Sequence, residues 1–273
     1  MPNLRIIYDN RADAATITAS TTSGTLVAAN MQTDYKGQCH RSTGTSVSYT
    51  LTWASDQTVQ GIALPCTNLT STATWRIRLY NSSDVVIADS TAITAVTGLN
   101  LNLNGWTTRN VNSFFYGGAS KSTYWFASSY NTVRKCVIDL VDTSNPAGYI
   151  DCSRVVVGEY WSPQYNVDKG MTIDVVDNSA VERRDSGDFA VDRKFLNDTI
   201  SFSFGLMTDS DRNELLKIIK LAGVTKNILV SVLPGNTSQK AEQDFTLYGK
   251  RNNSGFTYLV ESFYSHQMTL ESW

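Results

Sequence analysis

Side chains able to do acid–base or metal chemistry are few in this chain, and their spacing brings none of them together. The two histidines are His40 and His266. His40 follows Cys39, but neighbouring residues of a strand face opposite sides of a sheet, so these two cannot share a metal ion or a proton. No nucleophile pattern surrounds His266. The histidines therefore predict neither a metal site nor a general base.

Known catalytic and ligand-binding motifs are missing as well. The sequence has no G-x-S-x-G elbow, no phosphate-binding loop and no dinucleotide fingerprint. The D-x-D-x-N run at 209–213 begins like a calcium loop but lacks the glycine and the final acidic ligand, and helix capping explains it better. Asp185, Asp188 and Asp192 could hold a cation or form a solvated or interface turn. A glycosidase needs two carboxylates that lie close together in the fold, and the sequence does not indicate which acidic residues would form such a pair. We therefore predict a protein that is not an enzyme and holds no cofactor.

Composition excludes several classes of partner. Of the 273 residues, 41% are hydrophobic and 18% are charged, and the formal net charge is −2. This balance predicts globular domains without the excess of Lys and Arg that nucleic acid requires. No apolar stretch approaches the roughly 20 residues of a membrane helix. The N-terminus, MPNLRIIYDN, shows no signal-peptide pattern, so we expect synthesis in a cytoplasm without export by the usual route.

The four cysteines do not form a recognisable ligand set. Cys39, Cys66, Cys136 and Cys152 include no C-x-x-C pair. Reduced, buried core thiols are one interpretation, and a Cys136–Cys152 disulfide is the other. The sequence leaves both open.

The first part of the chain predicts a β-sandwich or barrel. Leu4–Tyr8 is an expected opening strand, Ser46–Trp53 and Trp75–Tyr80 alternate apolar and polar residues, and Asp84–Asp89 should pair with Trp75–Tyr80. No helix-length pattern occurs in the first 165 residues. The centre of this organisation is an expected hairpin in which Cys136–Val141 runs out and Tyr149–Gly158 runs back. The turn between them is Asn145–Gly148, and Pro163 ends the pairing.

After Pro163 the pattern changes to an α+β unit. Short strands are expected at Met171–Val176 and Ala180–Arg183, and a longer one at Thr199–Met207. One clear helix is expected at 209–222, with Thr208 as its N-cap and Gly223 as its stop. Strands at 228–233, 245–248, 257–261 and 267–273 complete the unit. We predict a mainly β protein with a jelly-roll β-sandwich over 1–163, a linker near 162–170, and a smaller α+β domain over 170–273.

Aromatic residues crowd the segment 105–130, GWTTRNVNSFFYGGASKSTYWFASSY. Such a segment can pack over the open end of a sandwich, contact another protein, or form a platform on which sugars stack. The candidates for glycan contact are Trp106, Arg109, Tyr116, Tyr124 and Trp125.

Two resemblances add to this interpretation. The first domain resembles discoidin-like, galactose-binding-like jelly rolls in ATITAS, the Asn30 segment, HRST, WRIRLY and GYIDCSRVVVGEYWSP. The whole chain resembles tail-tip or baseplate (minor tail) proteins of long-tailed bacteriophages, through FLNDTISFSFGLMTDSDRNELLKIIKLAGVTKNILVSVLPG and DFTLYGK. The resemblance implies a structural virion protein in the tail tip, present in several copies and bound to other tail or baseplate proteins.

Three functions follow as hypotheses. The first is a structural tail component that docks by its C-terminal domain and presents the jelly roll. The second is a carbohydrate-binding receptor module for a host surface glycan, and the third is a glycan hydrolase. Mixed charges in 183–194 favour an ordered docking interface over contact with membrane or nucleic acid, although a solvated loop is the alternative. The candidate interface residues are Arg183, Arg184, Asp185, Asp188 and Arg193.

Overall fold

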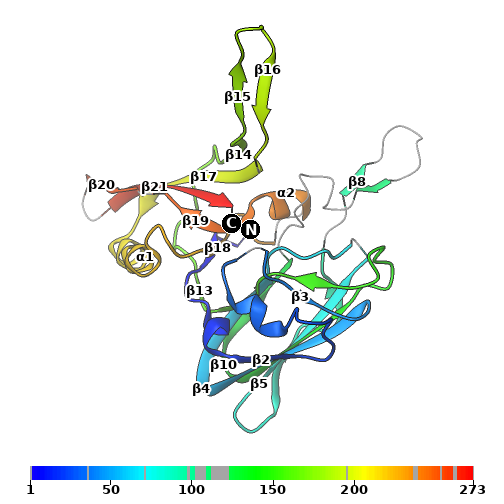
Figure 1. Cartoon of the computed structure of the whole chain (residues 1–273). Helices are drawn as coiled ribbons and strands as arrows, with labels where there is room; N and C mark the ends of the chain where they lie inside the picture. Colours follow the sequence, from blue (N-terminus) through cyan, green and yellow to red (C-terminus); the bar gives the residue numbers. More distant parts are fainter. Residues whose placement is uncertain are drawn as a thin grey trace.

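The computed structural model describes residues 2–35, 37–70, 72–96, 99–101, 109–111, 123–194, 196–235, 239–252, 254–260 and 263–272. Within these residues, most strands lie in one seven-stranded and one eight-stranded antiparallel sheet, and two α-helices are present. Figure 1 shows the seven-stranded sheet in the lower half of the view and the eight-stranded sheet, with both chain termini, above it. The predicted fold class is confirmed: the protein is mainly β, with a sandwich followed by a smaller α+β unit.

Two long strands build the sandwich. β4 (Ser46–Leu64) and β10 (Thr123–Val141) pair antiparallel along almost their whole length. Two register shifts interrupt the ladder, and such bulges bend strands, which allows the sheet to curve around its core. The sheet order is β12-β4-β10-β5-β6, with β2 on β4 and β7 on β5. The flanking strands are β2 (Thr16–Ala19), β5 (Thr74–Tyr80), β6 (Val86–Asp89), β7 (Ile93–Thr94) and β12 (Val156–Gly158).

The sandwich core follows from the period of two residues that strands impose. Tyr49, Leu51, Ile77 and Ile138 are fully buried, and Trp75 is 1% exposed. Each lies two residues from the next inward side chain on its strand, as alternation predicts. The expected pairing of the strand at 84–89 with Trp75–Tyr80 is confirmed, with β6 lying beside β5.

The second sheet has the order β13-β1-β18-β19-β21-β17-β14, and β20 pairs with β21. Its strands are β1 (Arg5–Ile7), β13 (Tyr160–Trp161), β14 (Thr172–Asp177), β17 (Leu196–Met207), β18 (Ile228–Ser231), β19 (Thr246–Arg251), β20 (Phe256–Val260) and β21 (Phe263–Ser272).

The predicted helix is confirmed as α1 (Asp209–Ala222). The Thr208 hydroxyl accepts a hydrogen bond from the Asp211 amide at 3.2 Å, and Gly223 ends the helix with a φ of 58°. Leu215 and Ile218 are fully buried against the sheet. The second helix, α2 (Gln239–Asp244), was not predicted.

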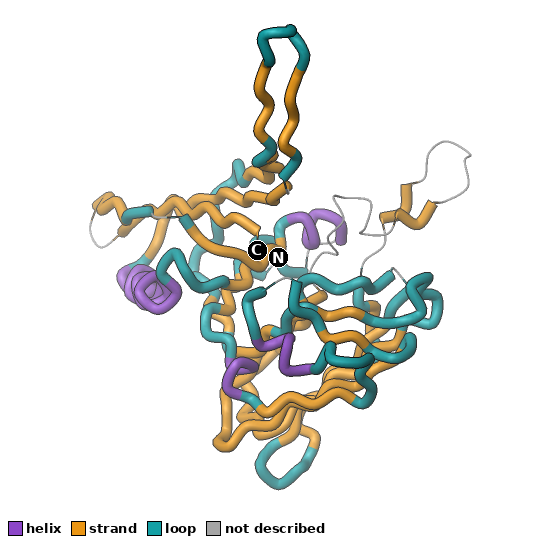
Figure 2. Tube along the Cα trace, viewed as in Figure 1, coloured by secondary structure: helices purple, strands orange, loops and turns teal. Residues whose placement is uncertain are grey.

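Shorter elements complete the fold. They are β3 (His40–Arg41) with β11 (Asp151–Cys152), β8 (Leu99–Leu101) with β9 (Arg109–Val111), β15 (Ala180–Arg183) with β16 (Phe189–Asp192), and the 3₁₀ helices η1 (Arg11–Ala14) and η2 (Ala28–Gln32). Figure 2 shows the β15–β16 hairpin as a pair of strands that rises away from the sandwich. Neither α-helix in the described part of the chain has the length and hydropathy that a bilayer crossing requires.

The predicted hairpin at Cys136–Gly158 is wrong. Cys136–Val141 is the end of β10, which pairs with β4 and β5. The expected return strand is divided into β11, which pairs with β3, and β12, which pairs with β4. Alternation shows that a segment can be a strand, but the partner is chosen by burial of distant residues. The predicted strand Ser46–Trp53 is likewise the first part of a longer strand, β4, which continues to Leu64.

The first strand also pairs differently from expectation. β1 lies between β13 and β18 in the second sheet, with Ile6 opposite Trp161 and Val230. The chain therefore passes between the two sheets twice, once after β1 and once before β13. The division into domains at 1–163 and 170–273 stays a prediction, and β1 belongs to the sheet of the second domain.

Candidate functional site: a clamped junction and a projecting arm

The two sheets meet through a small apolar cluster of their own. Ile7 and Leu229 of the second sheet pack with Ala63 and Val156 of the sandwich, and all four are almost completely buried. A glycine at position 158 makes this approach feasible, because a Cβ there would meet the Asp9 carbonyl oxygen at 2.5 Å. The junction is therefore a packed interface and not a loose linker.

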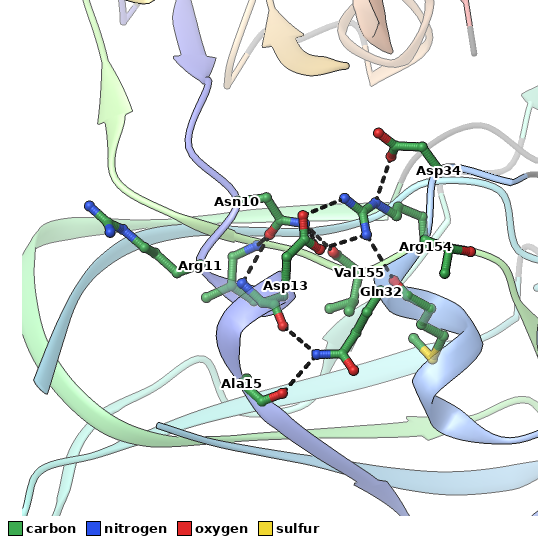
Figure 3. Close-up of polar contacts among 12 residues, drawn as sticks. Asn10, Arg11, Asp13, Ala15, Gln32, Asp34, Arg154 and Val155 are labelled. Carbon is green, nitrogen blue, oxygen red and sulfur yellow. Dashed lines mark hydrogen bonds and ion pairs between the residues drawn. The ribbon is translucent and has the colours of Figure 1, made fainter. Parts of the chain in front are cut away.

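Arg154 adds a polar clamp beside this cluster (Figure 3). Its side chain is 3% exposed, and its two terminal nitrogens donate to the two Asp13 oxygens at 2.7 and 2.8 Å. Its Nε donates to the Tyr248 hydroxyl at 3.0 Å and lies 3.1 Å from an Asp34 oxygen. The Tyr248 hydroxyl donates to Asp34 at 2.8 Å. Since Tyr248 belongs to β19, these bonds tie the sandwich to the second sheet.

Burial and pairing act against each other on the pKa values of this clamp. Burial raises the pKa of the Asp13 carboxyl above its usual value, and the hydrogen bonds and charge of Arg154 offset only part of that rise. Burial alone would lower the pKa of Arg154, but bonding to Asp13 and Tyr248 outweighs it, so the guanidinium stays charged. Burial also raises the pKa of Tyr248. The clamp is thus a desolvated cation held by two half-exposed carboxylates.

Asn10 and Gln32 position the carboxylate side of the clamp. Asn10 donates to the Val155 carbonyl at 2.9 Å and accepts from the Val157 amide at 2.9 Å. Gln32 donates to the carbonyls of Ala12 and Ala15 at 2.6 and 2.8 Å. These bonds join the segments around η1, η2 and β12, as Figure 3 shows. Sequence reasoning missed Arg154, although one arginine inside the apolar run after Cys152 is a signal that a buried charge needs partners.

Arg5 makes a further contact across the junction. Its guanidinium carbon lies 4.7 Å from the ring centres of both Phe126 and Tyr160. A cation between two aromatic rings is stabilised by both ring faces. Because Arg5 is in β1 and Phe126 in β10, this contact also holds the two sheets together.

Of the five candidate glycan residues, the structure describes the side chains of Tyr124 and Trp125. Trp106 and Tyr116 lie outside the described residues, and Arg109 is in β9 with its side chain not described. Tyr124 and Trp125 belong to β10, so the aromatic segment 105–130 ends in a strand of the sandwich. Neighbours on a strand face opposite sides, and these two pack into different clusters: Tyr124 into the junction and Trp125 against the sandwich core.

The Tyr124 ring packs against the apolar cluster of the junction. Its hydroxyl is hydrogen-bonded to Thr246 and Glu242 of the second domain, and burial raises its pKa well above the usual value. The contribution of all five candidates to glycan contact stays a prediction.

The candidate interface residues all lie on one projecting hairpin. We call residues 178–194 the arm; it carries β15 and β16 and rises from β14 and β17 (Figure 1). The turn at its tip is closed by the Arg184 amide donating to the Asp188 carbonyl at 2.8 Å. The Arg183 guanidinium lies over the Phe189 ring at 5.1 Å. Asp185 is at the tip, and Arg193 follows β16 near the base of the arm.

Sequence reasoning missed an apolar stripe along the arm and its base. Opposed residues of an antiparallel pair share a face, and Val181 faces Val191 while Phe189 faces Arg183. In β14, Ile173 faces Ile200, which is buried in the core of the second domain. Val175 lies two residues from Ile173 on the same strand and therefore on the same face. The stripe comprises Ile173, Val175, Val181, Phe189, Val191 and Leu196, which are 38 to 64% exposed.

A third polar cluster lies on the sandwich, and we call it the β3–β11 patch (Arg41, Asn68, Tyr149 and Asp151). Arg41 binds the two Asp151 oxygens at 2.8 and 2.9 Å and lies 4.0 Å from the Tyr149 ring centre. Asn68 accepts from the Asp151 amide at 2.8 Å and donates to the Tyr149 carbonyl at 3.0 Å. The side chains of Arg41 and Asp151 are 34% and 23% exposed. An aromatic ring thus sits beside convergent polar groups.

The histidines have structural partners. His40 Nδ1 lies 2.8 Å from the Tyr49 hydroxyl and Nε2 lies 2.9 Å from the Thr21 carbonyl oxygen, and burial lowers the pKa of His40. His266 Nδ1 lies 3.0 Å from the Gly255 carbonyl oxygen, and the ring stacks on Phe256. Among the described residues, no three His, Cys, Asp or Glu side chains are grouped as metal ligands would be. That the protein is not an enzyme stays a prediction.

Comparisons with known proteins give structural likeness only. No protein-family model matches the chain, and no curated protein matches it. A Streptococcus pneumoniae fucose-binding module matches with a TM-score of 0.38 and 12% identity, covering 56% of this chain and 99% of its own. A chitosan-binding module from a Paenibacillus chitosanase/glucanase matches with a TM-score of 0.38 and 18% identity over 55% and 99%.

A family 32 carbohydrate-binding module from Clostridium perfringens, in complex with galactose, matches with a TM-score of 0.38 and 12% identity over 58% and 99%. Identities and TM-scores of this size assign neither a family nor a ligand to this chain. The three structures are carbohydrate-binding modules, and the resemblance to phage tail proteins stays a prediction.

Proposed function

We propose that this protein is a non-enzymatic structural component of a larger assembly, namely the tail tip or baseplate of a long-tailed bacteriophage. Its C-terminal domain docks into the assembly, and the sandwich is presented outward. The observation that carries this proposal is the arm, which projects from the second sheet with its apolar stripe in water.

The stripe is unfavourable in a protein that acts alone, because its apolar side chains are exposed to water. A two-stranded hairpin is marginally stable in water and needs a packed face for support. Here Val181, Phe189 and Val191 are 60, 64 and 55% exposed on one face of such a hairpin. Contiguous exposed apolar residues rimmed by charges are typical of a protein–protein contact. Arg184, Asp185, Asp188 and Arg193 supply that rim and suit the setting of orientation.

The junction supports the second half of the proposal. The apolar cluster, the Arg154 clamp and the Arg5 contact hold the sandwich at one orientation to the second sheet. The arm points away from the sandwich (Figure 1). Docking by the arm therefore places the sandwich on the far side of the docked domain.

A pair of valine substitutions tests this proposal. The variant Val181→Ser/Val191→Ser removes the centre of the stripe, and the control Val85→Ser/Val86→Ser changes two valines of comparable exposure on the sandwich. Both should fold with the melting temperature of the parent. A phage disrupted in this gene is complemented with each variant, and the protein content of purified particles is quantified by mass spectrometry. We expect the arm variant to be depleted from particles and the control to be present in full; arm-variant particles of normal content would refute the proposal.

A second function, glycan binding by the sandwich, is favoured by the β3–β11 patch. Tyr149 offers an aromatic ring, and Arg41, Asn68 and Asp151 offer donors and acceptors for hydroxyl groups. A glycan array with the whole protein and with Arg41→Met tests it. Binding that Arg41→Met removes and Arg76→Met retains would support the patch, because Arg76 forms a similar pair with Asp89 on another strand. If the parent protein binds no glycan, or if Arg41→Met and Arg76→Met bind equally well, the patch is not a glycan site.

A further inference from the structure

Among the described residues, three strands of the second sheet have one edge without a partner strand: β13, β14 and β20. β13 has only two residues, both half-buried, so β14 and β20 offer the longer edges. In the part of the chain that the structure describes, β14 pairs with β17 alone and β20 pairs with β21 alone. All six residues of β14 are exposed, and so are Thr257, Tyr258 and Leu259 of β20. Figure 1 shows β20 at the left end of this sheet and the arm rising from β14 and β17. An unpaired edge strand offers amide and carbonyl groups to another strand.

We propose that β14 of one copy of this chain pairs antiparallel with β20 of a second copy, so that copies join head to tail through one continuous sheet. This inference rests on the proposed function and names one partner of the docking domain. The occupant of the β14 edge and the neighbouring stripe is a second copy of the same chain.

Strand direction favours this pair. β14 is antiparallel to β17, β17 to β21, and β21 to β20. β14 and β20 therefore run in opposite directions in one copy. When a second copy continues the sheet in the same orientation, its β20 meets β14 as an antiparallel strand, which is the pairing used throughout the sheet.

The faces of the two strands also match. Ile173 shares a face with the core residue Ile200, and Tyr258 shares a face with Tyr264, which packs on the same core. In a continuous sheet, Ile173 and Val175 would lie on the same side as Tyr258 of the next copy. At present Val175 and Tyr258 are 54% and 62% exposed. The joined sheet would bury them together and continue the apolar core from one copy to the next.

Charge disfavours the competing arrangement in which two β14 strands pair with each other. β14 carries Asp174 and Asp177 among six residues, so self-pairing places four carboxylates on one short ladder. β20, with the sequence FTYLV, carries no charge. One local bond must change on pairing, because the Val175 amide donates to the Asp174 carboxylate at 2.8 Å. The incoming strand replaces that bond with a backbone carbonyl.

Contact area indicates that the ladder is not the whole interface. A five-residue ladder is small beside the roughly 1,600 Å² of a standard stable interface. The exposed stripe residues Val181, Phe189 and Val191 extend from the same hairpin and supply further apolar surface. The arm would therefore reach over the neighbouring copy.

Disulfide trapping between differently marked copies tests the pairing. Half-exposed Cys39 and Cys66 are replaced by serine in a common background. A tagged Val175→Cys protein is mixed with an untagged Tyr258→Cys protein under mild oxidation. We expect a mixed dimer, little product from Val175→Cys alone, and little product with the exposed Thr257→Cys, whose side chain lies on the face of β20 opposite to that of Tyr258. A dimer of Val175→Cys with itself would overturn the head-to-tail arrangement in favour of self-pairing.

Sedimentation across a concentration series gives an independent measurement. The parent should form species larger than a monomer, and Tyr258→Lys should lose them, because an edge lysine blocks pairing. Val86→Lys changes the edge strand of the other sheet and should leave association intact. A parent that stays monomeric at all concentrations, together with absent trapping, would overturn this inference.

The two proposals fail separately. If the inference fails while the arm variant is still depleted from particles, the arm binds a different protein. If copies associate while the arm variant enters particles normally, the docking function is wrong.

Discussion

Replacing Arg154 by methionine should lower the free energy of unfolding by about 2–3 kcal/mol. Arg154 donates two bonds to Asp13 and one to Tyr248, and hydrogen bonds to charged groups contribute about 1.5–3 kcal/mol each. The full sum is not expected, because the Asp13 and Asp34 side chains are 45% and 43% exposed and water can replace part of the lost bonding. Methionine keeps most of the side-chain length, so the cavity contribution is small.

The assay is urea unfolding followed by tryptophan fluorescence and circular dichroism, and Arg11→Met is the control. Arg11 pairs with Asp9 at 2.9 Å, but the two side chains are 46% and 51% exposed. An exposed pair of this kind contributes about 0.5 kcal/mol. If Arg154→Met and Arg11→Met change stability equally, the Arg154 network is a solvated surface feature and the clamp does not hold the domains.

The same substitution has a pH dependence of definite sign. The pKa of Asp13 in the folded protein is already raised, and Arg154 is the group that lowers it. Removing Arg154 should raise this pKa further. A carboxyl with a raised folded-state pKa favours the folded state at low pH, and this advantage is lost as pH rises through the folded pKa. The destabilisation by Arg154→Met should thus be largest at neutral pH. It should shrink as the pH falls and the Asp13 carboxyl of the folded variant takes up its proton.

Three further predictions concern the domains, the sheets and the thiols. A protease cut within the exposed parts of 164–170 should leave two fragments that co-elute on size exclusion, because β1 stays paired in the second sheet; separate elution would contradict this. Gly249→Ala should destabilise by about 2–3 kcal/mol because its Cβ would overlap the backbone of β21, whereas the Cβ of Gly205→Ala meets only a movable carboxylate and should cost less than about 1 kcal/mol. Cys136 and Cys152 should not react with Ellman's reagent until the protein unfolds, since burial raises the pKa of Cys136 and brings that of Cys152 to about 12; four reactive thiols in the native state would refute this.

Local signals in the sequence predicted local structure well. The helix at 209–222 was found with its correct ends because the cap residues Thr208 and Gly223 act within one turn of the helix. The strands at 75–80 and 228–231 were found because alternation and apolar runs are properties of the segment itself. Cys136 and Cys152 are buried and not joined by a disulfide, as one of the two interpretations predicted, whereas Cys39 and Cys66 are only half-buried.

Pairing between distant strands could not be predicted in the same way. β1 pairs with β18, more than 200 residues along the chain, and no residue in Arg5–Ile7 indicates that choice. The expected return strand after Cys136–Val141 was wrong for the same reason. The residues of that segment do form strands, β11 and β12, but they pair with β3 and β4 and not with Cys136–Val141. Non-local pairing depends on which faces remain to be buried after all segments are placed.

For the candidate site as well, features of a single segment could be predicted, whereas features that depend on strand pairing could not. The charged residues of the arm stood out in the sequence as a dense run, and the structure gathers them on one hairpin. The apolar stripe was missed because its members come from four strands, and only the register of those strands places Val181 opposite Val191 and Ile173 opposite Ile200. Tyr124 was assigned to a glycan site on residue type alone, whereas its contacts across the junction depend on tertiary packing.

The position of β1 links these observations to assembly. Because β1 fills the position between β13 and β18, the second sheet is incomplete without the first residues of the chain. All other strands of this sheet come after the sandwich in the sequence. The sandwich is therefore attached to the second sheet by two chain connections, and the Arg154 clamp and the Arg5 contact lie beside them. Two attachments limit rotation far more than a single flexible linker would. A contact made by β14 and the arm then fixes the orientation of the sandwich as well, and head-to-tail pairing of copies would repeat that orientation at every copy.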